Sequence, residues 1–524
     1  MHRSVYVILL AFLAASAYLM TLGHKIHRAD FAYISGAEPE TLDPALITGA
    51  LEGRIADALF EGLTTYHPKD LSPQPGMAKR WEVSPDRLTY TFHLRQARWS
   101  NGDPLTAHDF VYSWRRVLAP QTASRYAYML YYLKNGEAFN EGALADPEQI
   151  GVKAADDRTL VVSLVHPTPY FLDLTGFSTL LPVNRRCIEA HGDHWTRTEN
   201  IATNGAFRMK EWRLNQYIRM VKNPDYWDAA NVRLHTVEAL AVENSNTGFN
   251  LYLTGAADYT GTVPLPLRRL VQSRPDYHTG VYLATYYYLL NVHRKPLDDP
   301  RVRKALAMSI DKAQICKYIT RGGEVPAPTF VPQGMPGYEG PKGLGFDPAD
   351  ARRLLADAGF PEGKGFPRLQ VLYNTSEAHR DVCEVVQQMW KDNLNIRVDL
   401  LNQEWKVYLD TTDRKDFDIA RASWIGDYTD PNTFLDMWVT NGGNNRTGWS
   451  NAKYDDLIRR AGMEPDPKQR MALFREAETV LVEQEMPIIP VYYFVTTEMY
   501  RPSVKGLYQN VRGMHPMKWI YVEK

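Results

Sequence analysis

The chain has 524 residues, of which 44% are hydrophobic and 23% charged, and its 60 Lys and Arg nearly balance its 61 Asp and Glu. This length exceeds what a single hydrophobic core serves, so two or three lobes are expected. The net charge is −1 and the sequence has no block of Lys or Arg, so it predicts no basic patch that would attract nucleic acid. This argues against nucleic acid as a partner.

The N-terminus predicts export from the cytoplasm. Arg3 precedes an apolar run from Val5 to Leu22, and Ala15-Ser-Ala17 has the small-x-small form of a signal-peptidase site. A run of about 18 apolar residues is also just long enough to span a bilayer. We therefore assign residues 1–28 to a signal peptide or an uncleaved N-terminal anchor. The body of the protein is expected in the periplasm, either free or tethered by this segment.

The first half of the chain predicts strands alternating with short helices. An opening strand begins at Phe31, and a helix is expected over 52–61. Residues 90–95 alternate between apolar and polar side chains, as in a half-buried strand, and a helix is expected over 107–117. Residues 159–164 form a further expected strand.

The second half predicts an α/β pattern. Asp299-Pro300 and Asp347-Pro348 each place an N-cap acid before a proline at the first helical position, and Gly359 is expected to end the second of these helices. Ser376 is expected to cap a third helix. Further strands are expected at 396–400, 417–424, 488–494 and 519–522. This alternation predicts a sheet covered by helices.

The most informative segment spans 402–431, because charged residues lie inside and directly after an expected buried strand. Arg421 lies within the strand and Asp427 follows its end. Buried charge is costly unless something pairs with it. A cation and an anion in this arrangement, with Trp405 and Trp424 nearby, suit a small zwitterion such as a peptide. The spacing alone leaves a second interpretation open, namely an internal ion pair and a turn acid.

Several motifs recur in the order found in one known family. They are Ala78-Lys-Arg-Trp-Glu-Val-Ser-Pro-Asp86, Trp99-Ser-Asn-Gly-Asp-Pro-Leu-Thr-Ala107, Asn223-Pro-Asp-Tyr-Trp227, Asp299-Pro-Arg-Val-Arg-Lys-Ala305 and Pro490-Val-Tyr-Tyr493. With these motifs the chain resembles, over nearly its whole length, the family 5 extracytoplasmic solute-binding proteins of bacterial ABC importers. Within that family it is most similar to the oligopeptide-binding type.

The resemblance implies an α/β fold of the periplasmic-binding-protein type (type II, cluster C), in which two lobes are joined by two crossings and an extra domain is inserted. The expected divisions are lobe I at 29–70, 196–285 and 489–524, the inserted domain at 71–195, and lobe II at 286–488. It also implies a monomeric binding protein rather than an enzyme. Such a protein captures short peptides, delivers them to an ABC permease in the cytoplasmic membrane, and needs no cofactor or metal.

The resemblance also implies roles for individual residues. Asp427 would pair with the α-ammonium group of the ligand, and Arg421 and His379 would face its carboxyl end or its later side chains. Positions that line the ligand cavity in relatives are matched by Trp405, Trp424, Tyr126, Tyr282 and Tyr287, and polar contact positions by Asn246 and Thr247. Considered alone, the aromatic residues are equally explained as core packing, and His379 as an ordinary helix-start residue.

Two departures from the family pattern concern the ligand. Thr412 stands where oligopeptide-type proteins carry an Arg that serves as a carboxylate partner, so the preferred peptide length is open. Arg414 or Lys415 is a candidate substitute for that Arg. The disulfide that some relatives carry beside the ligand is absent, because its positions correspond to Ala284 and Ile425.

Other functional classes have less support. The sequence contains no HExxH or GxSxG motif, and its three cysteines, Cys187, Cys316 and Cys383, match neither a nucleophile signature nor a zinc site. This argues against an enzyme. Within the binding class, a carrier of dipeptides, cell-wall peptides or another small solute remains open, as does an anchored peptide sensor.

Overall fold

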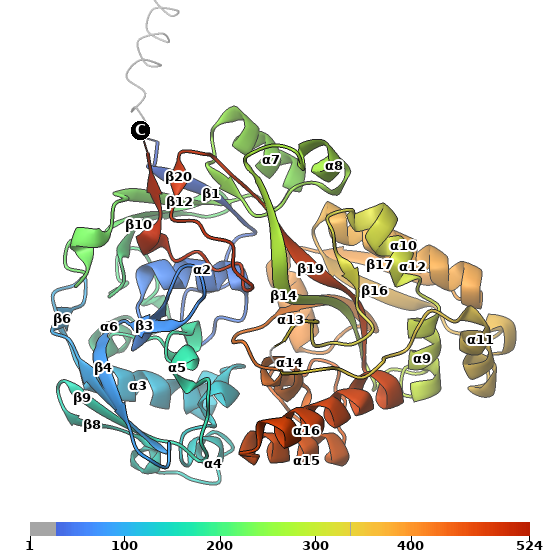
Figure 1. The fold of residues 1–524 in the computed structure, drawn as a ribbon, viewed down its shortest axis with the longest axis horizontal. Coiled ribbons are helices and arrows are strands. Elements are labelled where there is room, and N and C mark those ends of the chain that lie inside the picture. Colours follow the sequence, from blue (N-terminus) through green and yellow to red (C-terminus); the bar gives the residue numbers. More distant parts are fainter. Residues whose placement is uncertain (1–27, 336, 524) are drawn as a thin grey trace, which may run out of the picture.

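The computed structural model describes residues 28–335 and 337–523. The predicted signal peptide or anchor therefore lies outside the described residues, apart from its last position. Within the described part, no helix has both the length and the apolar character needed to cross a membrane. The architecture is mixed α/β, as expected, with helices packed around sheets (Figure 1).

Eleven strands of the described residues form one large sheet that extends through the molecule. In spatial order they are β10 (Phe207–Arg213), β11 (Tyr217–Lys222), β12 (Thr236–Ala241), β1 (Phe31–Gly36), β13 (Tyr259–Thr260), β19 (Ile488–Tyr500), β14 (Tyr277–Leu290), β18 (Ile419–Ile425), β16 (Leu369–Asn374) and β17 (Val398–Gln403), with β15 (Val325–Pro326) paired to β19. Strands from both ends of the sequence therefore meet in the centre of this sheet.

The two longest strands, β14 and β19, connect the two halves of this sheet. They run antiparallel through the middle of the molecule (Figure 1). The first part of β14 pairs only with β19, whereas its second part also pairs with β18. The pairing between β14 and β19 is interrupted between Val281 and Thr285. This interruption, where ladder hydrogen bonds are missing, is the natural place for one half of the sheet to bend relative to the other.

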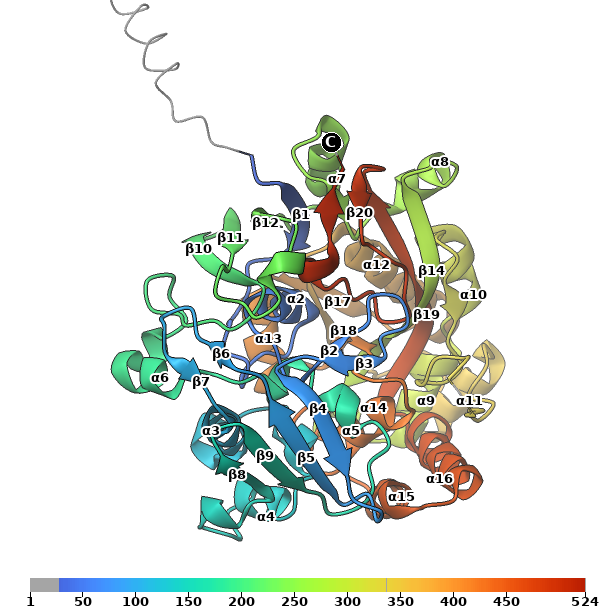
Figure 2. The same cartoon turned by 60° about the vertical axis from the view of Figure 1, so that its left-hand side comes forward.

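A separate sheet of four strands lies beside the large one (Figure 2). Its spatial order is β4 (Ala78–Val83), β5 (Thr89–Leu94), β9 (Thr159–Ser163) and β8 (Val152–Asp156). These strands fall within the predicted inserted domain, whose limits, like those of the two lobes, stay a prediction. The sheet packs with α3 (Ala107–Leu118), whose capping box joins Thr106 and Asp109.

The remaining long helices cover the large sheet or close its ends. They are α2 (Ala50–Leu59), α7 (Ser245–Thr254), α9 (Pro300–Met308), α11 (Pro348–Asp357), α12 (Glu377–Leu394), α13 (Trp405–Asp413), α15 (Ala452–Met463) and α16 (Pro467–Thr479). The predicted caps are confirmed, because the side chains of Asp299, Asp347 and Ser376 each accept a backbone N–H of the helix that follows. Gly359, at a φ of +99°, follows α11 as expected.

The predicted strand limits are less accurate than the predicted element types. The strand expected at 488–494 extends to Tyr500, because its second half continues into the other half of the sheet. The strand expected at 519–522 is reduced to β21 (Tyr521–Val522), which pairs with the short β20 (Val504–Lys505) rather than with the large sheet. Trp519 lies instead in a 3-10 turn.

Candidate functional site

A cavity of about 330 Å³ lies between the two halves of the large sheet and the inserted segment. It is within the size range of small-ligand sites. One wall is the chain from Ser423 to Asp427, and the opposite wall is Ile47–Leu51 with the first turns of α2. Gly176–Ser178, the loop from Arg512 to His515 and the side chains of Tyr126, Tyr282 and Trp405 also line it. Regions distant in sequence thus enclose one space.

Asp427 contributes a buried carboxylate that has almost no partner in the protein. The residue is 9% exposed and directly follows β18 and Gly426. Its backbone N–H donates to the Thr433 hydroxyl at 2.9 Å, but the same hydroxyl is 3.5 Å from the carboxylate, at the limit of a hydrogen bond. Among the described residues, no Lys, Arg or His pairs with Asp427 within 4 Å.

Burial strongly affects the ionisation of this group. Desolvation raises the pKa of Asp427 to about 7, against the opposing effects of Arg512 and of the Thr433 hydroxyl. The cavity therefore contains an acid whose negative charge is poorly stabilised by the protein. A cation entering the cavity would supply the missing stabilisation.

Arg421 is the second buried charge without an opposite partner. The residue is 6% exposed, donates from Nη1 to the Asn374 side-chain oxygen at 3.1 Å, and lies 4.7 Å from the centre of the Tyr286 ring. Its buried Nε has no hydrogen-bond partner. Within residues 28–335 and 337–523 no carboxylate lies within 4 Å of its guanidinium. The interpretation that Arg421 and Asp427 form an internal ion pair is therefore wrong.

His379 lies in the first turn of α12, next to Arg421. Burial and the nearby guanidinium together lower the pKa of His379 well below its usual value, so the ring is neutral. Its Nδ1 is buried without a hydrogen-bond partner, and its ring lies 5.8 Å from that of Tyr286. Arg421, His379 and Asn374 thus form a second polar group, which is outside the lining of the 330 Å³ cavity.

The strand between the two charges has a free edge. β18 pairs with β14 along its whole length, but on its other side it pairs with β16 only at Ile419 and Ala420. The backbone from Ala422 to Ile425 therefore has no strand on that side, and this part of the chain lines the cavity from Ser423 onward. A free strand edge inside a cavity is able to hydrogen-bond an extended backbone.

The structure places the predicted aromatic residues in two environments. Trp424, Trp405, Tyr126 and Tyr282 line the cavity, where Trp424 stacks on Tyr126 with ring centres 6.1 Å apart. Tyr287 instead packs edge-on against Phe330 and Trp438. Tyr287 shares a sheet face with Trp424, because Thr285 pairs with Trp424 and Tyr287 lies two residues further, but it sits farther along β14, opposite Ala422.

The weaker polar predictions lie outside the cavity. Asn246 is exposed on α7. Its neighbours Asn244 and Ser245 bond to Glu377 of α12. Arg414 pairs with Asp410 at 2.7 Å on an exposed helix surface, so its charge is already compensated. Thr412 is fully buried and bonds to a carbonyl of its own helix.

Three charged residues of the cavity were missed by the sequence reasoning, namely Arg54, Asp57 and Arg512. Arg54 and Asp57 lie three residues apart on α2 and thus share one helix face. Charged residues on the apolar face of the predicted helix were the sequence signal that could have identified Arg54 and Asp57. Arg512 lies in a C-terminal loop, where the sequence offered no pattern to indicate burial.

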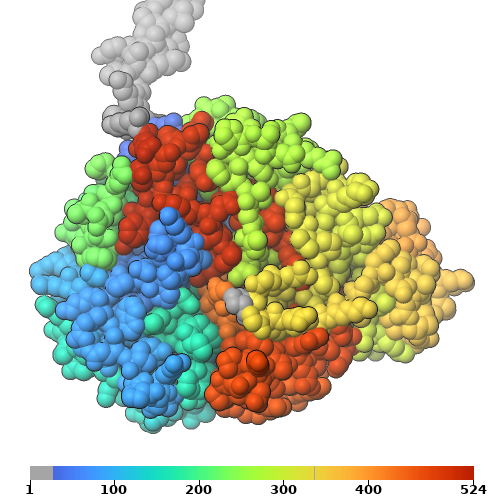
Figure 3. All heavy atoms as spheres, in the orientation of Figure 1, coloured from blue at the N-terminus to red at the C-terminus, as the bar shows by residue number. Residues whose placement is uncertain are grey.

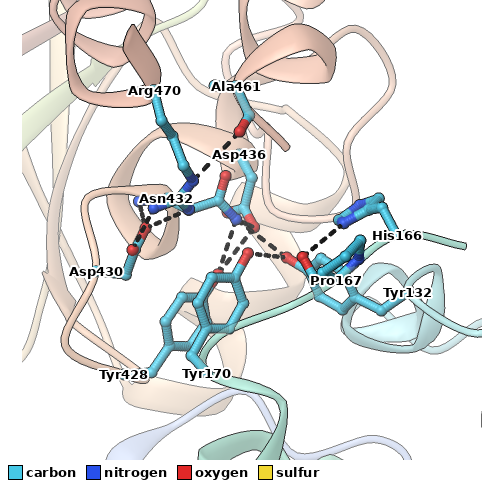
Figure 4. A network of polar contacts seen from close by, with 10 residues as sticks. All are labelled: Tyr132, His166, Pro167, Tyr170, Tyr428, Asp430, Asn432, Asp436, Ala461 and Arg470. Carbon is cyan, nitrogen blue, oxygen red and sulfur yellow. Dashed lines mark hydrogen bonds and ion pairs between the residues drawn. The ribbon is translucent and has the colours of Figure 1, made fainter. Parts of the chain in front are cut away.

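A polar clasp joins the inserted segment to the chain beyond the cavity (Figure 4). We use "tyrosine clasp" for Tyr132 and Tyr170 of the inserted segment with Tyr428, Asn432 and Asp436. Asn432 donates to the Tyr132 hydroxyl at 3.0 Å and to the Asp436 carboxylate at 2.8 Å. The Tyr170 and Tyr428 rings stack with centres 4.2 Å apart. Asp430 lies beside the clasp, held by both Nη atoms of Arg470 at 2.6 and 2.9 Å.

Two further contacts between segments far apart in the sequence help to close the cavity. The Trp405 indole donates to Glu52 at 3.3 Å, and Arg125 pairs with Asp413 at 2.8 Å, in each case across the cavity. In the space-filling view, the teal inserted segment packs directly against the orange-red helices (Figure 3). The structure is thus a closed conformation.

Comparison with known proteins gives a consistent result. A family model for bacterial extracellular solute-binding proteins, family 5, matches residues 72–446. The oligopeptide-binding protein OppA of Bacillus subtilis is 37% identical over 484 residues, covering 90% of this chain and 88% of the relative. The structure of Haemophilus influenzae OppA in complex with RPPGFSPFR superposes with a TM-score of 0.91 at 33% identity, covering 95% of this chain and 99% of the other.

Two structures of one relative distinguish the conformations. The murein tripeptide-binding protein MppA of Escherichia coli is 35% identical, covers 95% of this chain, and superposes with a TM-score of 0.91. Its unliganded open form, which is matched over 98% of its own length, superposes with a TM-score of only 0.63. The chain described here therefore has its lobes arranged as in the peptide complex and not as in the open form.

The buried carboxylate generates a prediction for the ligand-free protein. The pKa of Asp427 is about 7 in the folded protein and about 4 in an unfolded chain, so only the folded state holds this proton between those values. Raising the pH from about 4 to about 7 should therefore destabilise the wild type relative to Asp427→Asn by on the order of 4 kcal/mol.

Urea unfolding of both proteins at about pH 4.5 and about pH 7.5 measures this difference. Asp430→Asn is the matched control, because it removes a carboxylate that is already paired with Arg470. It should destabilise the protein at neutral pH. Equal pH dependence in the wild type and Asp427→Asn would contradict the unpaired state of Asp427.

Proposed function

The chain belongs to the bacterial extracellular solute-binding proteins of family 5, and we propose that it captures short oligopeptides between its two lobes and delivers them to an ABC permease. The observation that carries this proposal is a pair of buried, opposite and uncompensated charges at one strand, Arg421 within β18 and Asp427 two residues after its end. A peptide with free ends carries the complementary charges, an ammonium group at one end and a carboxylate at the other.

The distance between the two charges suits a short peptide. Six residues of extended chain span at most about 20 Å. Because both protein side chains also reach toward the ligand, a peptide of about three to five residues bridges them. The ammonium group would lie at Asp427 in the cavity, and the carboxyl end would extend toward Arg421, His379 and Asn374.

Between its ends, the peptide would be held by its backbone. The free edge of β18 from Ala422 to Ile425 offers N–H and C=O groups that do not depend on side-chain identity. The aromatic wall of Trp405, Trp424, Tyr126 and Tyr282 provides broad contact area for varied side chains. This combination favours recognition of the ends and the backbone over recognition of one sequence.

The proposal includes the setting in which the protein works. Curated relatives are periplasmic oligopeptide-binding proteins, which supports a periplasmic location and a monomer that meets its permease in the closed form. Family members bind substrates and are not enzymes, so bound peptides should be released intact. The N-terminal segment that would direct export, or tether the protein, lies outside the described residues.

Removing the carboxylate should affect only ligands that carry an ammonium group. Asp427→Ala should weaken binding of free-amino tripeptides by about 2–4 kcal/mol, because the buried ammonium group then has no partner. Binding of the N-acetylated peptides, measured by isothermal titration calorimetry, should change much less. Equal losses for both kinds of peptide would refute the assigned role.

A similar experiment tests recognition of the carboxyl end of the peptide by Arg421. Arg421→Gln should weaken binding of peptides with a free carboxylate by about 1–3 kcal/mol and have little effect on C-terminally amidated ones. Arg414→Gln serves as the control, since Arg414 is paired with Asp410 outside the cavity. A loss that is the same for free and amidated peptides would show that Arg421 acts only in folding.

The tyrosine clasp should determine how slowly ligand leaves. The hydrogen bond from Asn432 to the Tyr132 hydroxyl joins the inserted segment to the chain after β18, so we expect it to form on closure. Asn432→Ala should raise the peptide dissociation rate about tenfold, because the closed form loses this bond and leaves the partly buried Tyr132 hydroxyl with fewer partners. Stopped-flow displacement measures this rate, with the exposed and remote Tyr508→Ala as control. An unchanged rate in a folded Asn432→Ala variant would show that the clasp does not contribute to closure.

A further inference from the structure

Arg54 places a cation on the cavity wall that faces the amino end of the proposed ligand. It lies on α2, one turn inside the segment that forms the wall opposite Asp427. Its guanidinium lies 5.6 Å from the centre of the Tyr259 ring. Two carboxylates interact electrostatically with Arg54, namely Glu498 and Asp57, the latter one helical turn further along α2.

Glu498 acts on Arg54 only from a distance, because its close contacts are with other groups. The Glu498 carboxylate lies 2.9 Å from His515 Nε2 and accepts a hydrogen bond from the Tyr259 hydroxyl at 3.1 Å. No oxygen of Glu498 lies within 4 Å of the Arg54 guanidinium. The cation of Arg54 therefore has no ion-pair partner within the residues that the structure describes.

Asp57 and Arg512 also lie near Arg54, and no ion pair within 4 Å joins any two of these three described residues. Asp57 faces the same cavity, and Arg512 is the cation with the largest electrostatic effect on it. The Arg512 guanidinium lies 4.9 Å from the centre of the Tyr66 ring, and this contact orients the cation. Asp427, as proposed above, is matched by the ammonium group of the ligand. With the ammonium group of the ligand at Asp427, the lining keeps the cations of Arg54 and Arg512 against the single carboxylate of Asp57, so the cavity holds a surplus positive charge.

We propose that Arg54 is a specificity residue, which gives the cavity a preference for peptides with an acidic side chain in the first or second position. The inference rests on the proposed function, because the position of the amino end at Asp427 places these side chains in the part of the cavity that Arg54 lines. A carboxylate there would form the missing ion pair with Arg54 in a space shielded from water. A basic side chain there would be repelled by the Arg54 guanidinium.

Isothermal titration calorimetry with matched tripeptides tests this preference. The ligands are Glu-Ala-Ala, Ala-Glu-Ala and Ala-Ala-Glu, with the corresponding Gln and Lys peptides and Ala-Ala-Ala. At the first or second position, Glu should bind about tenfold more tightly than Gln, and Lys should bind more weakly than Gln. At the third position, which lies toward Arg421, Arg54 should confer no such preference.

Two variants assign the preference to Arg54. Arg54→Gln should remove the advantage of Glu over Gln at the first and second positions, while binding of Ala-Ala-Ala stays within about twofold of the wild type. Arg54→Met, which keeps the length of the side chain without its charge, should give the same result. Arg414→Gln, at a compensated cation outside the cavity, should leave the preference unchanged.

The possible results separate the two proposals. If the wild type binds Glu and Gln peptides equally, or if Arg54→Gln retains the preference for Glu, the role of Arg54 is wrong. In either case tight binding of Ala-Ala-Ala would still support peptide capture. Failure of the folded wild type to bind any of these peptides would instead contradict the proposed function.

Discussion

The structure depends on one electrostatic constraint: two opposite charges are buried within and directly after β18, and neither has an oppositely charged partner within 4 Å among the described residues. The Asp427 carboxylate has one weak hydrogen bond, and the Arg421 guanidinium is held by an amide oxygen and an aromatic ring. Separate burial of two ions costs several kcal/mol. A ligand that carries both opposite charges removes both costs at once, and a peptide with free ends is such a ligand.

This constraint couples binding to closure. Closing the lobes around an empty cavity desolvates both ions without compensation, so closure should be less favourable without ligand than with it. Binding compensates the charges, and contacts such as the tyrosine clasp and the pair of Arg125 and Asp413 then stabilise the closed form. The pairing interruption in β14 between Val281 and Thr285 provides the place where such a motion bends the sheet.

Much of the fold could be predicted from local patterns. The Asp-Pro caps at Asp299 and Asp347 and the alternation in β5 are local signals, and the structure confirms them. The extent of β19 could not be predicted, because its second half is a strand only through pairing with distant chain segments. Within the candidate site, Asp427 and Trp424 follow from an expected strand. Arg512 could not be found, because only the folded chain brings its loop to the cavity.

The most direct test of this account is a crystal structure of the protein grown with a mixture of tripeptides to pentapeptides. The account predicts continuous density for an intact peptide along the free edge of β18, with its ammonium group at Asp427 and its carboxyl end directed toward Arg421. A peptide bound in the reverse direction, bound outside the cavity, or found cleaved would contradict it.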